Sequence, residues 1–230
     1  MKYEKIVEGK FISRPNRFIA HVEIDGKKET VHVKNTGRCK ELLLENAKVY
    51  LEESQNPERK TKYDLVSVYK GDTLVNMDSQ APNKVAVEFL KESNLFSKNA
   101  KIKPEYKIGA SRIDIFVEDG ERKALIEVKG VTLENDGIAM FPDAPTERGI
   151  KHINELIEAQ KEGYECYILF VIQMKGITLF KPNFTTHFEF GKALQKAEKS
   201  GVKILAYDCI VTQGTLKIDE PVLVNLENED

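Results

Sequence analysis

The chain has 230 residues, 41% hydrophobic and 31% charged; this length suits one large domain or two modest ones, and this composition excludes a disordered chain. The longest apolar run, Cys166–Ile172, and the polar first ten residues exclude a membrane-spanning helix and a secretory signal, so we expect a cytoplasmic protein. The formal net charge of −2 excludes a uniformly positive surface, so any site for a polyanion must be a local patch.

The first 78 residues alternate short apolar strands with turns. Apolar residues at every second position predict strands over residues 18–24, 30–33, 48–51 and 65–69. Asp25-Gly26 supplies a hairpin turn between the first two of them. Four or five short strands in about 75 residues are typical of a small β-barrel or sandwich. We therefore expect an OB-like β-barrel domain over residues 1–78.

Helices and strands are mixed in the remainder of the chain. The spacing of apolar residues predicts helices over residues 82–95, 146–163 and 191–199. The predicted strands cover residues 102–108, 112–118, 123–129, 164–172, 177–180 and 202–207. Three strands thus come between the first two helices, and two strands come between the second helix and the third. This order predicts a second domain over residues 79–230 of the α/β class, with an α+β mixed sheet.

Charged residues interrupt two of these apolar strands. Asp114 lies within one of them, and Glu127 and Lys129 lie two residues apart at the end of the next. Because side chains alternate along a strand, Glu127 and Lys129 share a face, and Asp114 joins it if the pairing register allows. A buried pair of carboxylates is unfavourable unless hydrogen bonds or a cation such as a divalent metal ion compensate it. An edge-strand ion pair with Asp114 in solvent explains these residues equally well.

Four blocks of sequence resemble the signature blocks of the sugar fermentation stimulation protein family. They are residues 35–38, 109–114, 126–133 and 141–152, and the resemblance extends over essentially the whole chain. It implies an OB-like amino-terminal domain followed by a restriction-endonuclease-like core of the PD-(D/E)xK superfamily. It also implies DNA binding without marked sequence preference and a link to the regulation of sugar (maltose) metabolism.

The resemblance further implies roles for single residues. Asp114 matches the first acid of the PD-(D/E)xK motif, Glu127 the second acid and Lys129 the lysine, so these three are the candidate catalytic residues. Glu88, on the preceding helix, falls where some nucleases of this class carry an additional metal-binding acid. Ile113 stands where the motif nominally has proline, a departure that many members share.

The implied reaction is the metal-dependent hydrolysis of a phosphodiester. Asp114 and Glu127, with Glu88 as a third candidate ligand, would hold Mg²⁺ or Mn²⁺, because hard carboxylate oxygens suit these ions. Lys129 keeps its charge beside two carboxylates and would orient the attacking hydroxide. The alternative is a non-catalytic DNA-binding regulatory factor with a vestigial site. The sequence leaves open whether the DNA is single- or double-stranded and whether the protein forms a homodimer.

Candidate contacts to DNA phosphates lie in both predicted domains. In the first domain they suit the groove along which OB barrels bind a strand, and in the second they flank the acidic residues. These candidates are Arg14, Arg17, Asn35, Arg38, Arg112, Arg148 and His152. Each of them also fits an ordinary position at the protein surface. Phe11, Phe18 and Tyr50 are candidates for stacking on bases, although core packing is the more frequent role of such residues.

Overall fold

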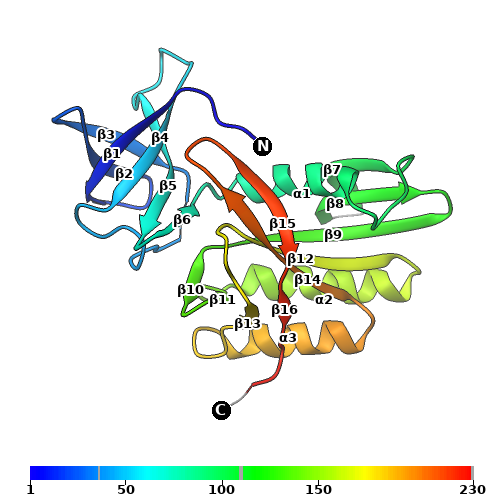
Figure 1. Ribbon diagram of the computed structural model, residues 1–230. Coiled ribbons are helices and arrows are strands. Elements are labelled where there is room, and N and C mark those ends of the chain that lie inside the picture. The colour runs from blue at the N-terminus through cyan, green and yellow to red at the C-terminus, as the bar shows by residue number, and fades with distance from the viewer. Residues whose placement is uncertain (36, 109–110, 229–230) are drawn as a thin grey trace.

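The computed structural model describes residues 1–35, 37–108 and 111–228 (Figure 1). A β-barrel forms one end of the molecule, and a layered arrangement of sheets and helices forms the other. Thr36, Gly109 and Ala110, which belong to the sequence blocks compared above, lie outside the described residues. In the described part of the chain, no helix is long and apolar enough to cross a membrane.

The barrel consists of five strands that close on themselves. In spatial order β3-β2-β1-β4-β5, its strands are β1 (Ile6–Ser13), β2 (Ile19–Ile24), β3 (Lys27–Val33), β4 (Lys48–Glu53) and β5 (Tyr63–Lys70). Parallel pairing of β3 with β5 closes the ring, and β6 (Thr73–Asn76) extends the sheet beyond β5. The predicted OB-like barrel is therefore confirmed.

Two local features explain the first strands of the barrel. Asp25 and Gly26 have φ angles of 50° and 73°, as a two-residue hairpin turn requires, and β2 pairs with β3 across them as predicted. The sequence analysis misses β1, because Gly9 interrupts the pattern of that strand. A Cβ atom at position 9 would lie 2.6 Å from Val22 Cγ1, so glycine is what allows β1 and β2 to approach each other here.

A second, mixed sheet carries the acidic residues singled out above. In the order β15-β14-β12-β9-β8-β7, its strands are β7 (Lys101–Ile108), β8 (Ser111–Asp119), β9 (Arg122–Val131), β12 (Glu165–Ile172), β14 (Lys203–Val211) and β15 (Leu216–Pro221). The neighbours β7, β8 and β9 are antiparallel, whereas β9, β12 and β14 are parallel. The predicted mixed α/β class is confirmed. The edge strand β15 is missing from the prediction.

Helices cover both faces of this sheet (Figure 1). α1 (Ala81–Glu92) packs on one face, and α2 (Glu147–Lys161) and α3 (Phe188–Lys199) pack on the other. Ile126 of β9 lies in the core beneath α1, whereas its neighbour Leu125 lies in the core beneath α2 and α3. Because side chains alternate along the strands, the sheet separates two hydrophobic cores, one on each face. All three helices are predicted by the sequence, with ends shifted by no more than a few residues.

Four short strands form a small separate sheet. They are β10 (Leu133–Asn135), β11 (Ile138–Phe141), β13 (Leu179–Pro182) and β16 (Leu223–Val224), in that spatial order. Only β13 overlaps a predicted strand, because runs of two to four residues contain too little pattern to be recognised. β11 leads into the loop that precedes α2.

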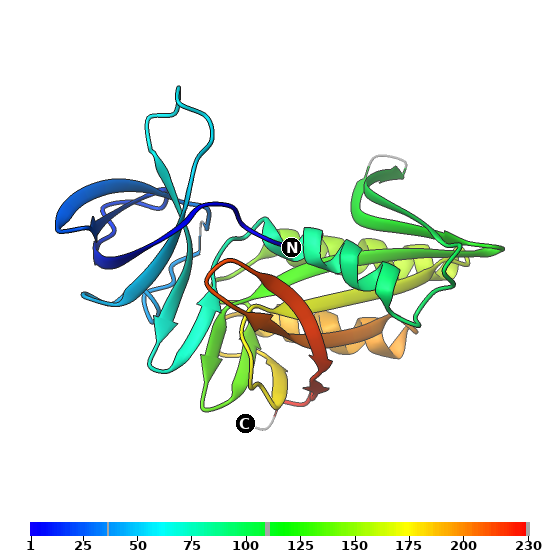
Figure 2. The same cartoon turned by 45° about the horizontal axis from the view of Figure 1, so that its top comes forward.

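Hydrogen bonds at two places attach the barrel to the layered part, and Lys70 on β5 pairs with Glu134 on β10 at a third. Asn76 N donates to Gln173 O at 2.8 Å, and Gln173 Nε2 donates to Asn76 Oδ1 at 2.8 Å. At the other place, Tyr3 N donates to Gly214 O at 2.8 Å, and Figure 2 shows the first residues running beside the β14–β15 hairpin. The junction is thus held by backbone and side-chain hydrogen bonds from both sides. The boundary between residues 78 and 79 stays a prediction.

Candidate functional site

Asp114 lies where β8 and β9 stop pairing. The register between these strands extends from Asp119↔Arg122 to Ile115↔Ile126 and ends there. Beyond that point, the side chain of Asp114 accepts hydrogen bonds from Val128 N at 2.9 Å and from Asn83 Nδ2 of α1 at 3.0 Å. The Asp114 carboxylate is therefore fixed by β9 and by α1 at the same time.

Glu127 is the buried acid of the candidate site. It is 2% exposed, and its Oε1 lies 2.5 Å from Lys129 Nζ. The same oxygen contacts His152 Nδ1 of α2, and Arg148 Nε donates to His152 Nε2 at 3.3 Å. The predicted phosphate contact His152 thus binds Glu127 in this structure, and Arg148 reaches the site through His152. Two donor groups therefore contact Glu127: Lys129 from its own strand and His152 from α2.

The pKa values of the two carboxyl groups are shifted in opposite directions. Burial raises the pKa of Asp114 and the charge of Glu127 raises it further, against the opposing effect of the bonds from Val128 and Asn83. Burial also acts to raise the pKa of Glu127, but His152 and Lys129 outweigh it and hold that pKa below its ordinary value. Glu127 is therefore a stabilised anion, whereas Asp114 carries a charge that the surrounding groups only partly compensate.

Asp114 and Glu127 are the residues of this site that could hold a divalent cation. Mg²⁺ is commonly held by one or two carboxylates together with water and substrate phosphate, so two acids suffice. A positive ion would also relieve the charge on Asp114. Among the described residues, no three His, Cys, Asp or Glu side chains gather into a group that could hold a metal ion. The candidate ligand set is accordingly Asp114 and Glu127.

Glu88 lies apart from these two acids. Its side chain is 52% exposed and lies 2.6 Å from the amino group of Met1. The structure does not bring it together with Asp114 and Glu127, so its role as a metal ligand remains a prediction that the geometry does not support.

The candidate DNA contacts in the barrel separate into two kinds. Arg14 donates to the carbonyl oxygens of Arg17, Asn35, Gly37 and Arg38 at 2.6–2.9 Å, and so holds the loop after β3 against the loop after β1. Asn35 is 9% exposed; its Oδ1 accepts a hydrogen bond from Gly37 N within that loop, and its Nδ2 donates to Met77 O, beyond β6. Arg17 and Arg38 are exposed. Arg14 and Asn35 therefore support the loop, whereas Arg17 and Arg38 are available to a ligand.

The structure also shows the surroundings of Arg112 and of the three aromatic candidates. Arg112 lies on β8 and forms an ion pair of 2.6 Å with Glu105, on β7. Phe11 and Tyr50 are buried. Phe18, directly after Arg17, is 55% exposed, so it is the one aromatic of the three that is free to stack on a base.

The sequence analysis misses two functional contacts of the site. Asn83 orients Asp114, and its only signal is an uncharged polar side chain in the first turn of α1. The contact of His152 with Glu127 depends on how α2 packs against β9, which the spacing of residues along the chain does not specify.

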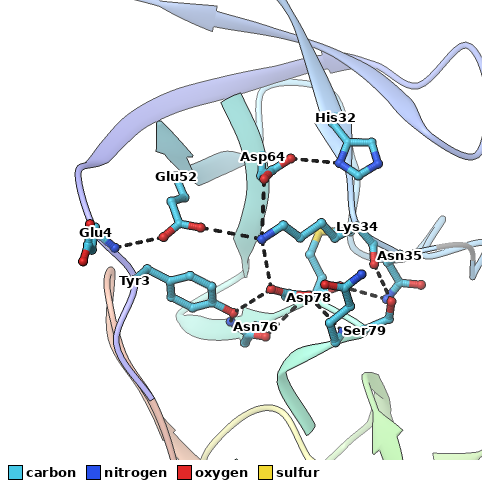
Figure 3. A network of polar contacts seen from close by, with 12 residues as sticks. Tyr3, Glu4, His32, Lys34, Asn35, Glu52, Asp64, Asn76, Asp78 and Ser79 are labelled. Carbon is cyan, nitrogen blue, oxygen red and sulfur yellow. Dashed lines mark hydrogen bonds and ion pairs between the residues drawn. The ribbon is translucent and has the colours of Figure 1, made fainter. Parts of the chain in front are cut away.

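A second polar cluster lies at the junction of barrel and sheet (Figure 3). Lys34 Nζ lies 3.5–3.6 Å from carboxylate oxygens of Glu52, Asp64 and Asp78. Tyr3 Oη donates to Asp78 Oδ2 at 3.3 Å, and Asp78 is 2% exposed. Since Asp78 lies between β6 and α1, this cluster fixes the chain where it passes from the barrel to the first helix.

Comparison with known families was made on the whole chain. Residues 12–77 match the family model described as the SfsA N-terminal OB domain. Residues 80–215 match the model described as the sugar fermentation stimulation protein RE domain. Together these matches cover most of the chain.

Similar proteins and structures extend over almost the full length. The chain is 56% identical over 226 residues to a sugar fermentation stimulation protein homolog of Clostridium beijerinckii, covering 98% of this chain and 100% of that protein. It is 57% identical to the homolog of Ruminiclostridium cellulolyticum, with the same coverage. Among solved structures, that of Pyrococcus furiosus SfsA in complex with Ca²⁺ is similar with a TM-score of 0.85, 26% identity and 98% coverage of both chains.

Proposed function

Because the chain belongs to the sugar fermentation stimulation protein family, we propose that it is a cytoplasmic DNA-binding protein with a Mg²⁺- or Mn²⁺-dependent phosphodiesterase centre of the PD-(D/E)xK type. Binding without marked sequence preference and a link to the regulation of sugar (maltose) metabolism are parts of the same proposal. The observation that carries it is the position of Asp114 beside Glu127-Val128-Lys129, where β8 separates from β9.

A relative supports the choice of a divalent cation. The similar structure from Pyrococcus furiosus is described as a complex with Ca²⁺. Ca²⁺ and Mg²⁺ both select oxygen ligands such as carboxylates. Asp114 and Glu127 are acids of the kind that such an ion requires.

The side chains of the site have separate tasks in the proposed reaction. Asp114 and Glu127 supply oxygens to the ion, and Lys129 places a positive charge next to the approaching phosphate. His152 holds the Glu127 carboxylate in position, and Arg148 adds charge beside His152. When bound, the ion would polarise the scissile phosphate and lower the pKa of its bound water.

Nicking of supercoiled plasmid in Mg²⁺ or Mn²⁺ tests the proposal. Asp114→Ala and Glu127→Gln should each reduce the rate about 100-fold or more, because each removes a metal-binding carboxylate. Glu118→Gln is the matched control, since Glu118 lies on the same strand in exposed ion pairs with Lys101 and Lys103 and should leave the rate unchanged. Absence of nicking by highly purified wild-type protein, or full activity of Asp114→Ala, would contradict the enzymatic proposal.

The second candidate function is DNA binding without turnover. It is favoured by the contacts of Lys129 and His152 with Glu127, which satisfy this acid without any metal ion. In that case the wild-type protein yields no cleavage product, and salt-dependent DNA binding survives Asp114→Ala. Binding and nicking measured on the same samples separate the two functions.

A further inference from the structure

We infer that a single strand of DNA lies along one continuous groove that runs from the barrel, across the junction, to the exposed side of α1. This inference rests on the proposed function and assigns it a ligand form and a path. It adds Lys40, Lys84 and Lys91 to the residues that contact the ligand.

Three neighbouring hollows, called here the interdomain groove, make up the path. The first, of about 580 Å³, lies beside Arg17 and Arg38 of the barrel. It shares Gly37, Ala144 and Pro145 with the second, of about 320 Å³. The second shares Ser79 with the third, of about 760 Å³, which follows α1. Each hollow thus shares lining residues with the next, and the proposed path follows this order.

The two ends of the groove carry cations that are available to phosphates. Arg17, Arg38 and Lys40 line the first hollow, and Lys84 and Lys91 line the third. All five are exposed, and their side chains form no ion pair within the described residues. Single-stranded nucleic acid is bound by this combination of a groove with unpaired positive charge.

The acidic residues of the groove do not cancel this charge. Glu88 and Glu105 in the third hollow are already paired with the Met1 amino group and Arg112. Asp143 lies in the middle hollow, where a carboxylate can accept hydrogen bonds from the amino group of a base.

The candidate catalytic residues do not line these three hollows, but two residues of the groove wall are connected to them. Gly130, in the wall of the second hollow, directly follows Lys129. Asn83, in the wall of the third, donates to Asp114.

The dimensions and the exposed aromatic favour one strand over a duplex. The middle hollow of about 320 Å³ lies at the small end of the range for pockets that take one small molecule. A space of this size suits a single nucleotide better than a base pair with both backbones. At the barrel end, the exposed Phe18 follows Arg17 and offers the stacking surface that single-strand binders use.

Binding of a fluorescent twelve-nucleotide oligodeoxycytidine in EDTA tests the path without cleavage. Lys84→Glu/Lys91→Glu should weaken binding about tenfold or more and reduce the slope of log K against log salt by about 1.4, as expected when two phosphate contacts are lost from a single strand. Arg17→Glu/Arg38→Glu should have a similar effect. The control is Lys192→Glu/Lys199→Glu, an exposed pair with the same seven-residue spacing on α3, which should bind as the wild type does.

The outcomes distinguish the path from the proposed function. Loss of binding in only one of the two groove variants, or an equal loss in the α3 control, would overturn the continuous path while leaving DNA binding intact. A blunt duplex of the same length that binds as tightly as the single strand would overturn the inference of single-strand recognition. Failure of the wild-type protein to bind either oligonucleotide at low salt would overturn the proposed function itself.

Discussion

Among single residues, Asp114 is a carboxyl group whose ionised form the folded protein disfavours. Burial and Glu127 raise its pKa, so the folded protein binds the proton of Asp114 more tightly than the unfolded chain does. Ionisation of this carboxyl therefore opposes folding, and the opposition grows as the pH rises from the unfolded-state pKa through the folded-state pKa. The proposed metal site would account for this cost, because a bound cation would offset the charge of Asp114.

We expect Asp114→Asn to raise the free energy of unfolding of the metal-free protein at pH 7. The gain should disappear near about pH 3, where the carboxyl is protonated in both states. Urea denaturation of the variant and the wild type at the two pH values measures this gain in the free energy of unfolding. Glu127→Gln should act in the opposite direction at pH 7, because the pKa of Glu127 is lowered in the folded protein. A less stable Asp114→Asn variant at pH 7 would show that the charge of Asp114 is fully compensated.

Asp64 of the barrel shows the reverse behaviour. Burial acts to raise its pKa, but hydrogen bonds from Arg59 and His32 and the charge of Lys34 bring the pKa to about 2. A lowered carboxyl pKa stabilises the fold above the unfolded-state pKa, and this stabilisation is lost as the pH falls towards about 2. We expect Asp64→Asn to lower the free energy of unfolding at pH 7 by about 1–2 kcal/mol, after allowance for screening. The deficit should shrink on acidification, and a deficit that is constant between pH 7 and about pH 2 would contradict this assignment.

Sequence reasoning at the residue scale singled out the two acids and Lys129 as candidates from their position in apolar strands. It could not assign their partners. Asn83 and His152 reach the acids from helices on opposite faces of the sheet, and such contacts depend on tertiary packing. Arg14 shows the same limit, because only the folded loops reveal that it binds four carbonyl groups of the chain.

At the scale of elements, the start of α2 controls the position of His152. Thr146 caps this helix, since its side chain accepts a hydrogen bond from Gly149 N at 3.1 Å. Thr146→Ala should lower the free energy of unfolding by about 1 kcal/mol, which is typical for the loss of such a cap. Thr146→Ser should retain most of the stabilisation that the cap provides, because serine also accepts this hydrogen bond. Thermal or urea denaturation of the two variants provides the comparison. Equal stability of Thr146→Ala and wild type would mean that the cap is replaced by water.

Elements with a long apolar pattern could be predicted, and short or interrupted ones could not. The three helices and the central strands of the mixed sheet bury a complete face, which leaves a periodic signal. β10, β11 and β16 have two to four residues each and depend on their neighbours for pairing. β15 lies at a sheet edge, where alternating burial gives a weaker pattern.

For the whole molecule, the Lys34 cluster links the stability of the barrel to its attachment. Burial acts to lower the pKa of Lys34, but Asp78, Asp64 and Glu52 raise it, so its stabilising charge is present up to alkaline pH. Lys34→Met would leave the buried Asp78 and Asp64 without this partner and should cost on the order of 3 kcal/mol. Lys28→Met, at an exposed position on β3, is the control and should change stability by less than about 0.5 kcal/mol. Equal denaturation midpoints for the two variants would contradict a structural role of the cluster.

The double attachment of the barrel also has a consequence for association kinetics. A module tethered by one linker can swivel, and a ligand must then wait for the two bodies to align. Here the hydrogen bonds of Asn76 to Gln173 and of Tyr3 to Gly214 tether the barrel at both sides, which suppresses swivelling about the segment that precedes α1. The width of the interdomain groove is then fixed before the ligand arrives. Stopped-flow mixing with an oligonucleotide should therefore give a single bimolecular phase without a slower, concentration-independent step.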